Sequence, residues 1–237
     1  MTSVLCYRCG SQVKDGADKC WKCGAQLAGG ASTSIPSLDE LRERQKTRSR
    51  LSGVVHKVGD VIGGRYEVQD ILGSGGAGVV YRAHDQEIDV EVAVKVINAK
   101  LVQTADEKKL FSKEIKVARK LSHQNIVRIF DEGHDGDRVF ASMQYLDGLP
   151  LRKIIDLRRS KEQLFTVEEV EPLLNQLCQA LDYAHRFTFH GNLKPDNVIV
   201  LPELLKITDF GILKALPRKP FLAIQKARKV NFNYYAP

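Results

Sequence analysis

The sequence predicts an α+β fold of two lobes, preceded by a small cysteine-rich unit. Three observations support this prediction: short runs of β-type residues over 66–145, helical periodicity that is clearest over 167–186, and two closely spaced cysteine pairs before residue 27. The 237 residues are 43% apolar and 27% charged, which are ordinary values for a globular protein. This composition excludes a wholly disordered, collagen-like or membrane-embedded chain.

The chain divides into three segments. Residues 1–27 form the cysteine-rich unit, 28–60 a flexible basic linker, and 61–237 the two-lobed domain. We expect the first lobe to span about 61–146 and an incomplete second lobe about 147–237. No run approaches the ~18 apolar residues of a membrane span, and the N-terminus lacks the pattern of a signal peptide. The sequence therefore predicts a cytoplasmic protein without a membrane span.

The positive charge is concentrated in two stretches. The formal net charge is +7, yet 212–237 holds six basic and no acidic residues, and 41–57 holds six basic residues and one acidic residue. The remainder of the chain is slightly acidic. The basicity is therefore local, and it does not by itself indicate a nucleic-acid-binding protein.

The first lobe is expected to hold five antiparallel strands and one helix, because its apolar runs are short and alternate with polar residues. The helix is expected at 105–121, and the turn 134–137 joins the last two strands. Beyond residue 149 the periodicity is helical, and Cys178 lies in an apolar helical pattern that predicts a buried position. The strands are expected at 66–72, 79–83, 91–97, 126–131 and 138–145.

The four cysteines near the N-terminus form two units of one pattern, in which two residues separate the cysteines and a glycine follows. They are Cys6, Cys9, Cys20 and Cys23. Each pair can place two thiolates on one tetrahedral Zn²⁺, and four cysteine ligands make a closed, structural site. The pattern resembles the zinc-ribbon family over roughly 4–26, whose members bind proteins or nucleic acids. The alternatives are four unrelated thiols and a redox dithiol, the latter less favoured because no βαβ pattern surrounds it.

A glycine-rich loop lies between the first two predicted strands. Gly73, Gly75 and Gly78 fit a G-x-G-x-x-G-x-V pattern whose valine is Val80. Because a strand and not a helix follows, the loop does not match the dinucleotide-binding fingerprint. The next strand carries Val92-Ala93-Val94-Lys95, which places an ammonium group where it can reach phosphates under the loop. The sequence therefore predicts a phosphate-binding site here.

Three further motifs follow in order along the chain. Glu114 lies in the next predicted helix, His190-Gly191-Asn192-Leu193-Lys194-Pro195-Asp196-Asn197 follows the long helical segment, and Asp209-Phe210-Gly211 comes after it. With the glycine-rich loop and its lysine strand, these motifs resemble the protein kinase family over about 66–237. The opening Gly64-Arg65-Tyr66-Glu67 is similar to that of the bacterial serine/threonine (Hanks-type) branch. The resemblance implies a bilobal kinase-like fold.

The resemblance also implies roles for the charged and amide residues. Lys95 would hold the α- and β-phosphates of ATP and would be held in turn by Glu114. Asp209 and Asn197 would bind Mg²⁺. Lys194 would be directed at the phosphate being transferred, as in serine/threonine kinases. The set of residues that handles ATP in this family would then be complete in this chain.

By the same resemblance, the adenine ring would lie between the two lobes. Val80 and Ala93 would cover it from above and Ile199 from below. Met143 would be the gatekeeper at the back of the pocket. The hinge that connects the lobes would run from Gln144 to Leu146.

The catalytic loop departs from the family pattern. The family has His-Arg-Asp where this chain has His190-Gly191-Asn192. Asn192 thus stands at the base position, where an amide cannot accept the substrate hydroxyl proton as a carboxylate does, a contribution typically worth ~10²–10⁴-fold. Gly191 replaces an arginine that grips a phosphorylated activation segment in many kinases, and 210–237 contains no Ser or Thr. Similar loops occur in the pseudokinase domains of regulatory receptors.

The resulting hypothesis is a regulatory protein that binds ATP and Mg²⁺ in its kinase-like domain, Zn²⁺ in its ribbon, and a protein partner or protein substrate. Two alternatives are open: an active serine/threonine kinase that tolerates Asn192, and a nucleic-acid-binding adaptor that acts through the ribbon and the basic linker. The family pattern continues beyond Pro237, so the second lobe is expected to be incomplete and to expose apolar surface. The sequence does not define an oligomeric state.

Overall fold

The computed structural model describes residues 3–5, 12–14, 17, 19–22, 55–202 and 204–227. Two strands of the cysteine-rich unit, β1 (Ser3–Leu5) and β2 (Gln12–Lys14), pair antiparallel. Cys20 is buried, whereas the other three predicted zinc ligands and most of the linker lie outside the described residues. The zinc ribbon therefore stays a prediction.

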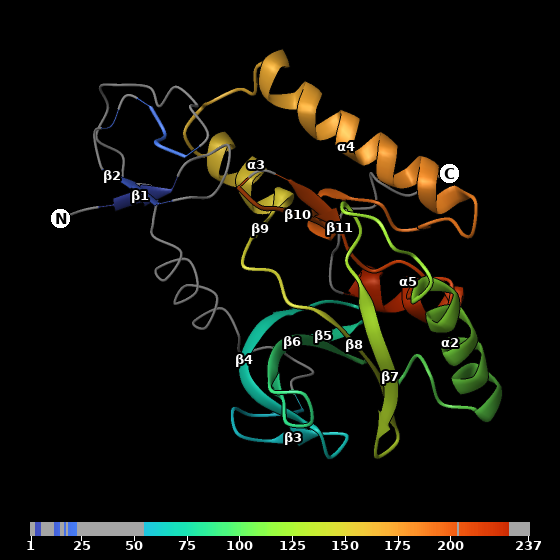
Figure 1. Cartoon of the computed structure of the whole chain (residues 1–237). Helices are drawn as coiled ribbons and strands as arrows, with labels where there is room; N and C mark the ends of the chain where they lie inside the picture. Colours follow the sequence, from blue (N-terminus) through green and yellow to red (C-terminus); the bar gives the residue numbers. More distant parts are fainter. Residues whose placement is uncertain are drawn as a thin grey trace.

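The first lobe is a six-stranded antiparallel sheet accompanied by one helix (Figure 1). The strands lie side by side in the order β3-β4-β5-β6-β8-β7. The five predicted strands are confirmed, the fourth displaced towards its hairpin turn, and the two-residue strand β3 adds a sixth at the edge. Their bounds are β3 (Val61–Ile62), β4 (Tyr66–Ser74), β5 (Gly78–Asp85), β6 (Val90–Ile97), β7 (Ile129–Asp135) and β8 (Arg138–Gln144).

Strand β6 directs its side chains alternately to two separate apolar clusters, as the period of a strand requires. Val92, Val94 and Val96 pack in the outer cluster of the sheet, with Tyr66 and Phe140 among its other members. Ala93 and Ile97 belong to the main core, which extends into the second lobe. Lys95 lies between these two residues in the alternation. Its side chain therefore faces the second lobe.

Helix α2 (Ala105–Ala118) is the predicted first-lobe helix, and it lies beside β7. A capping box begins it: the Thr104 hydroxyl accepts from the Glu107 amide, and the Glu107 carboxylate accepts from the Thr104 amide. Phe111, Ile115 and Ala118 form its buried stripe. The spacing of these residues places one helical face on the core.

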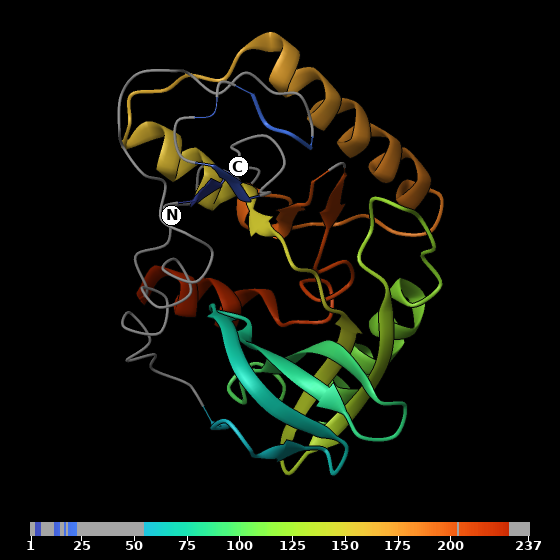
Figure 2. The ribbon, with the colours of Figure 1, turned by 60° about the vertical axis from the view of Figure 1, so that its left-hand side comes forward.

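The second lobe combines helices with a small sheet in the order β11-β10-β9. Figures 1 and 2 show α4 along the outside of this lobe, and α5 between the second lobe and the first-lobe sheet. The elements are β9 (Leu149–Pro150), α3 (Leu151–Arg159), α4 (Val167–His185), the 3₁₀ turn η1 (Pro195–Asn197), β10 (Val198–Val200), β11 (Leu205–Ile207) and α5 (Arg218–Ala227).

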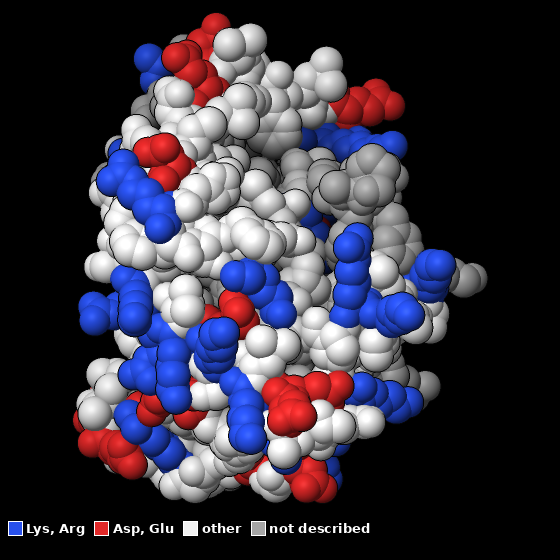
Figure 3. Space-filling model, turned by 90° about the vertical axis from the view of Figure 1, so that its right-hand side faces the viewer, with Lys and Arg blue, Asp and Glu red and all other residues white. Residues whose placement is uncertain are grey.

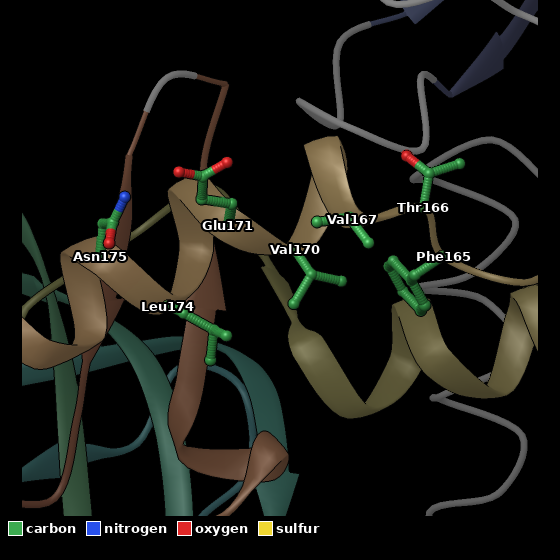
Figure 4. A pocket seen from close by; sticks show the side chains of 7 residues that line it. All are labelled: Phe165, Thr166, Val167, Val170, Glu171, Leu174 and Asn175. Atoms are coloured by element: carbon green, nitrogen blue, oxygen red, sulfur yellow. The ribbon is translucent and has the colours of Figure 1, made fainter.

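The prediction that Cys178 is buried is wrong, because α4 packs through a different stripe. Ala180 and Ala184 are fully buried in the main core, whereas Cys178 is exposed. On the outer side of α4, Val167 is 74% and Leu174 52% exposed. They line a hollow of about 430 Å³ (Figure 4), which confirms that this lobe presents apolar surface. The spacing of the apolar residues predicted the helix correctly, but it did not predict which side of the helix faces the core.

Residues 55–60, at the end of the predicted linker, lie against the first-lobe sheet. The amides of Val55 and His56 donate to the Tyr81 hydroxyl, and the His56 ring lies edge-on to the Tyr81 ring. His56 Nε2 lies 3.2 Å from Asp135 Oδ2. In the described part of the chain, no helix has the length and apolar character needed to cross a membrane.

One ion pair joins α3 to the start of α4. The Arg158 guanidinium donates two hydrogen bonds to the Glu169 carboxylate, at 2.7 and 2.8 Å, and a third to the Leu164 carbonyl. It also stacks on Phe165 at 4.0 Å from the ring centroid. The side chains are only 6% and 15% exposed, so water screens this pair poorly.

We expect Arg158→Met to lower the free energy of unfolding by about 3 kcal/mol, because it leaves the Glu169 carboxylate largely buried without its cation. Urea denaturation followed by circular dichroism measures this change. Arg159→Met, the same substitution at the exposed neighbouring residue, is the control and should cost far less. Equal losses in the two variants would contradict a structural role for the pair.

Candidate nucleotide and phosphotransfer site

The glycine-rich loop is the turn between β4 and β5. The Gly75 amide donates to the Gly78 carbonyl at 2.8 Å, and Gly73 pairs with Val80 across the two strands. At Gly78, φ is +156° and an added Cβ would lie 2.0 Å from the Val96 carbonyl oxygen. Only glycine fits there, because the backbone of β6 approaches so closely. The close approach of β6 therefore fixes the loop at Gly78, where β5 begins.

Lys95 and Asp209 meet between the lobes. Lys95 Nζ lies 2.5 Å from Asp209 Oδ2, and the two side chains are 8% and 14% exposed. Asp209 follows β11 with φ at +71°, in the left-handed region where only a few residue types are common. The sequence separation of 114 residues makes this a contact between the two lobes. The structure thus brings together the predicted phosphate-binding ammonium and the predicted metal-binding carboxylate.

The catalytic loop is anchored by a buried histidine. His190 Nε2 lies 2.8 Å from the Thr208 carbonyl oxygen, and His190 Nδ1 accepts from the Asn192 amide at 3.1 Å. Since Nδ1 accepts, Nε2 carries the proton and donates, which is the neutral form of the ring. Burial lowers the pKa of His190 below its ordinary value, and the bond to Thr208 opposes this only in part.

Asn192 is positioned through its backbone. Its amide bonds to His190, and its carbonyl oxygen accepts from Asn197 Nδ2 at 2.9 Å. Gly191, directly before it, has φ at +72°, which glycine adopts without strain. The Asn197 carbonyl oxygen accepts in turn from the Thr208 amide at 3.0 Å. This network fixes the loop whatever side chain residue 192 carries.

Lys194 and Asn197 flank the same short turn. Lys194 is the N-cap residue of η1 and is partly exposed, so its ammonium can reach a ligand. Asn197 ends η1 and is 6% exposed. Because the Asn197 side-chain NH₂ group donates to the Asn192 carbonyl, the side-chain oxygen of Asn197 is the atom that remains for a cation.

Four of the predicted adenine-site residues lie in or against one apolar cluster. Ala93 pairs with Met143 across β6 and β8, and both are buried in the main core. Val80 and Leu146 pack against that core. Ile199 lies on β10 of the second lobe, partly buried, and pairs with Pro150. The predicted hinge begins at Gln144, whose amide donates to the Arg128 carbonyl.

The expected pairing of Glu114 with Lys95 is wrong for this structure. Glu114 Oε2 instead lies 3.0 Å from Lys214 Nζ, with the two side chains 14% and 26% exposed. Lys95 is engaged by Asp209. Lys214 lies just beyond the Asp209-Phe210-Gly211 motif and brings a competing ammonium to α2. The Glu114 carboxylate therefore pairs with Lys214 and not with the expected Lys95.

Lys214 and Gln225 are the residues of this region that the sequence did not identify. In the sequence these residues stand out only as part of the basic stretch 212–237, which is most simply interpreted as a solvated surface. No local pattern predicts that Lys214 reaches α2, because the pairing depends on how the chain folds back after β11. Gln225 is likewise a polar residue in a short helix, yet it is only 4% exposed.

These parts define a bilobal fold with a lysine–aspartate pair at the junction of its lobes. Known proteins agree with this class: the protein kinase domain model matches residues 66–237. The chain belongs to the protein kinase family.

Bacterial serine/threonine kinases are among its relatives. Serine/threonine-protein kinase PrkC of Bacillus subtilis is 32% identical over 161 residues, which cover 67% of this chain and 24% of PrkC. PknD of Chlamydia trachomatis is 33% identical over 144 residues, which cover 57% of this chain and 15% of PknD. The chain thus spans about a quarter or less of the length of these curated relatives.

Solved kinase structures support the same fold. The PknI kinase domain of Mycobacterium tuberculosis superimposes with a TM-score of 0.60 at 28% sequence identity. The match covers 67% of this chain and 64% of the PknI chain. The likeness therefore extends to most of the described two-lobed domain.

We expect the free energy of unfolding to fall as the pH is lowered through the ordinary histidine value of 6.5. The unfolded chain binds a proton at His190 more readily than the folded chain, so acidification favours unfolding. Urea denaturation at pH 7.5 and 5.5 measures the loss. His190→Gln should reduce it, and His185→Gln on the exposed end of α4 should not. Unchanged acid sensitivity in His190→Gln would rule out this origin.

Proposed function

We propose that this chain is an ATP- and Mg²⁺-binding, serine/threonine-kinase-like regulatory protein that transfers phosphate weakly or not at all. One observation carries the proposal. Lys95 contacts Asp209, and Asn197 bonds to the backbone of Asn192, which supports a shared nucleotide site, whereas the base position is occupied by Asn192. The chain has kept the groups that hold the nucleotide and lost the group that accepts the proton.

The donor atoms suit a magnesium–nucleotide complex. Mg²⁺ prefers oxygen ligands, and the site offers the Asp209 carboxylate and the side-chain oxygen of Asn197. Lys95 would hold phosphate oxygens in the position where it now contacts Asp209. When bound, Mg²⁺ neutralises phosphate charge. The residues of this chain would orient the nucleotide and keep its phosphates near Lys194.

The loss of the carboxylate at residue 192 limits proton transfer. General-base catalysis is worth ~10²–10⁴-fold, and a neutral amide does not supply it. Phosphoryl transfer nevertheless relies mainly on positioning and charge stabilisation, which Lys95 and Lys194 still offer. A slow residual reaction is compatible with this arrangement. The principal output would then be a nucleotide-dependent shape presented to a protein partner.

The second candidate is an active serine/threonine kinase acting on a protein substrate. The names of the relatives favour it, since PrkC and PknD are serine/threonine-protein kinases. In that case the Asn192 amide would orient the substrate hydroxyl without taking its proton.

Nucleic-acid binding through the ribbon and the linker is a third candidate, and most of both segments lies outside the described residues. Acidic and basic side chains alternate over the lower part of the face in Figure 3. Two lysines of α2 and the arginine at its C-cap lie within ion-pair distance of carboxylates: Lys109 with Asp106, Lys116 with Glu132, and Arg119 with Asp131. Failure to retain DNA or RNA at low salt would remove this candidate, because such binding depends on phosphate charge.

We expect Asn192→Asp to raise transfer of the γ-phosphate to a generic protein substrate by about 100-fold or more. The loop should be undisturbed, because Asn192 bonds to His190 and Asn197 through its backbone amide and carbonyl. A radiolabelled-ATP assay of both proteins measures the change. Asn175→Asp, the same change on the outer face of α4, is the control and should leave the rate unaltered.

Lys95→Met tests whether any observed transfer comes from this site. Robust transfer by the unmodified chain that Lys95→Met abolishes would refute the weak-kinase proposal and establish the active kinase. Absence of nucleotide binding in the unmodified chain at millimolar ATP would refute both.

For the cysteine-rich unit we propose a structural Zn²⁺ held by Cys6, Cys9, Cys20 and Cys23. We expect about one zinc per chain by elemental analysis, since four thiolates complete one tetrahedral site. Cys20→Ser should lower the zinc content sharply, whereas Cys178→Ser, at the exposed cysteine of α4, should not. A wild-type chain without zinc would disprove the ribbon.

A further inference from the structure

The cysteine-rich unit lies against the second lobe. Both ribbon views show β1 and β2 beside α3 (Figures 1 and 2). Lys22, which stands between Cys20 and Cys23 in the sequence, lines a hollow of about 290 Å³. The other described residues around this hollow, which we call the α3 groove, come from α3, α4, β10 and the segments next to them. A residue of the N-terminal unit therefore closes one side of a groove in the second lobe.

The walls of the α3 groove on the side of the lobe are mainly apolar. Ile154 of α3 and Val200 of β10 belong to a small apolar cluster that is separate from the main core, and Leu151 packs against this cluster. Helix α4 adds Leu173, and the turn between β10 and β11 adds Leu204. The cysteine-rich unit thus lies over apolar surface of the lobe, which favours its docking there.

Strand β10 connects the α3 groove with the predicted nucleotide site. Successive side chains of a strand point to opposite faces, so Ile199 points away from the groove that Val200 lines. An added Cβ on Gly148, two residues beyond the predicted hinge, would lie 2.8 Å from Ile199 Cγ2. Ile199 is also the residue predicted to lie below the adenine ring. One face of β10 is therefore turned to the cysteine-rich unit and the other to the nucleotide site.

The sheet that contains β10 is small. Strand β9 has two residues, and β10 and β11 have three residues each. Strands this short hold their position only through the elements that pack on them. On the side of the α3 groove these elements are α3 and α4, and the groove leaves room between them. The position of β10 therefore depends on what occupies the groove.

We propose that the cysteine-rich unit docks in the α3 groove and stabilises β9 and β10, so that Ile199 is held in position for a nucleotide. The partner that fits this surface is a segment of the same chain, and Lys22 is its contact residue. Undocking would loosen β10 and lower the affinity for Mg·ATP. The inference rests on the proposed nucleotide site and assigns its regulation to the N-terminal unit.

Trp21 makes docking directly measurable. It is the single tryptophan of the chain and the neighbour of Lys22. While the unit is docked, the fluorescence anisotropy of Trp21 should decay with the tumbling of the whole chain, whereas an undocked unit adds a faster decay. Hydrogen–deuterium exchange of 149–159 and 198–207 without nucleotide reports how firmly β9, β10 and α3 are held. Calorimetric titration with Mg·ATP measures affinity.

Lys22→Glu and Leu204→Lys should each undock the unit. The first places a carboxylate in a groove that Glu169 also lines, and the second places an ammonium in the apolar wall opposite Lys22. We expect each variant to add the fast anisotropy decay, to speed exchange, and to bind Mg·ATP about five-fold more weakly. The double variant joins opposite charges again and should restore all three measurements.

Lys14→Glu is the matched control, because it makes the same charge change at an exposed residue of β2 that is not among the described residues of the groove. It should match the wild type. A fast anisotropy decay in the wild type, unchanged exchange in both single variants, or a double variant without recovery would overturn the docking. Undocking with unaltered affinity for Mg·ATP would overturn the stabilising role.

The proposed nucleotide function can fail separately. Undocking of both single variants that the double variant reverses, with no Mg·ATP binding by any of these proteins, would support the docking at Lys22 and reject the nucleotide site.

Discussion

The two lobes meet at a buried ion pair between Lys95 and Asp209. A buried charge is costly unless it is paired, and here each side chain supplies the other's partner from the opposite lobe. The alternation of β6 explains why Lys95 is available: its neighbours in the period, Ala93 and Ile97, are packed in the shared core. The lobes are thus held in register by a contact whose two groups are also those that would receive a phosphate and its metal.

The absence of a carboxylate at residue 192 is compatible with an intact loop, because the backbone contacts of this residue are separate from the chemistry of its side chain. The side chains of His190 and Asn197 bond to the amide and the carbonyl oxygen of Asn192, and neither bond involves the Asn192 side chain. Gly191 accommodates the positive φ that precedes it. A change of chemistry at residue 192 therefore does not require a change of fold.

Local signals predicted the first lobe well and the contacts between distant segments poorly. The strands and α2 follow from periods of two and 3.6 residues, and the motif order placed Lys95 and Asp209 in one site. The partner of Glu114 could not be predicted, because Lys214 reaches it only after the chain folds back from β11. The prediction that Cys178 is buried was wrong for a related reason. Periodicity shows that a helix has an apolar side, whereas burial depends on which side meets another element.

Helix α5 is an element that tertiary contacts must stabilise. Its first turn contains Arg218 and Lys219 and no acidic residue, which is unfavourable at the positive end of a helix dipole. It is also only ten residues long, a length at which isolated helices are marginal in water. Its stability therefore comes from the burial of Phe221 and from the ion pair that Lys214, just before the helix, makes with Glu114.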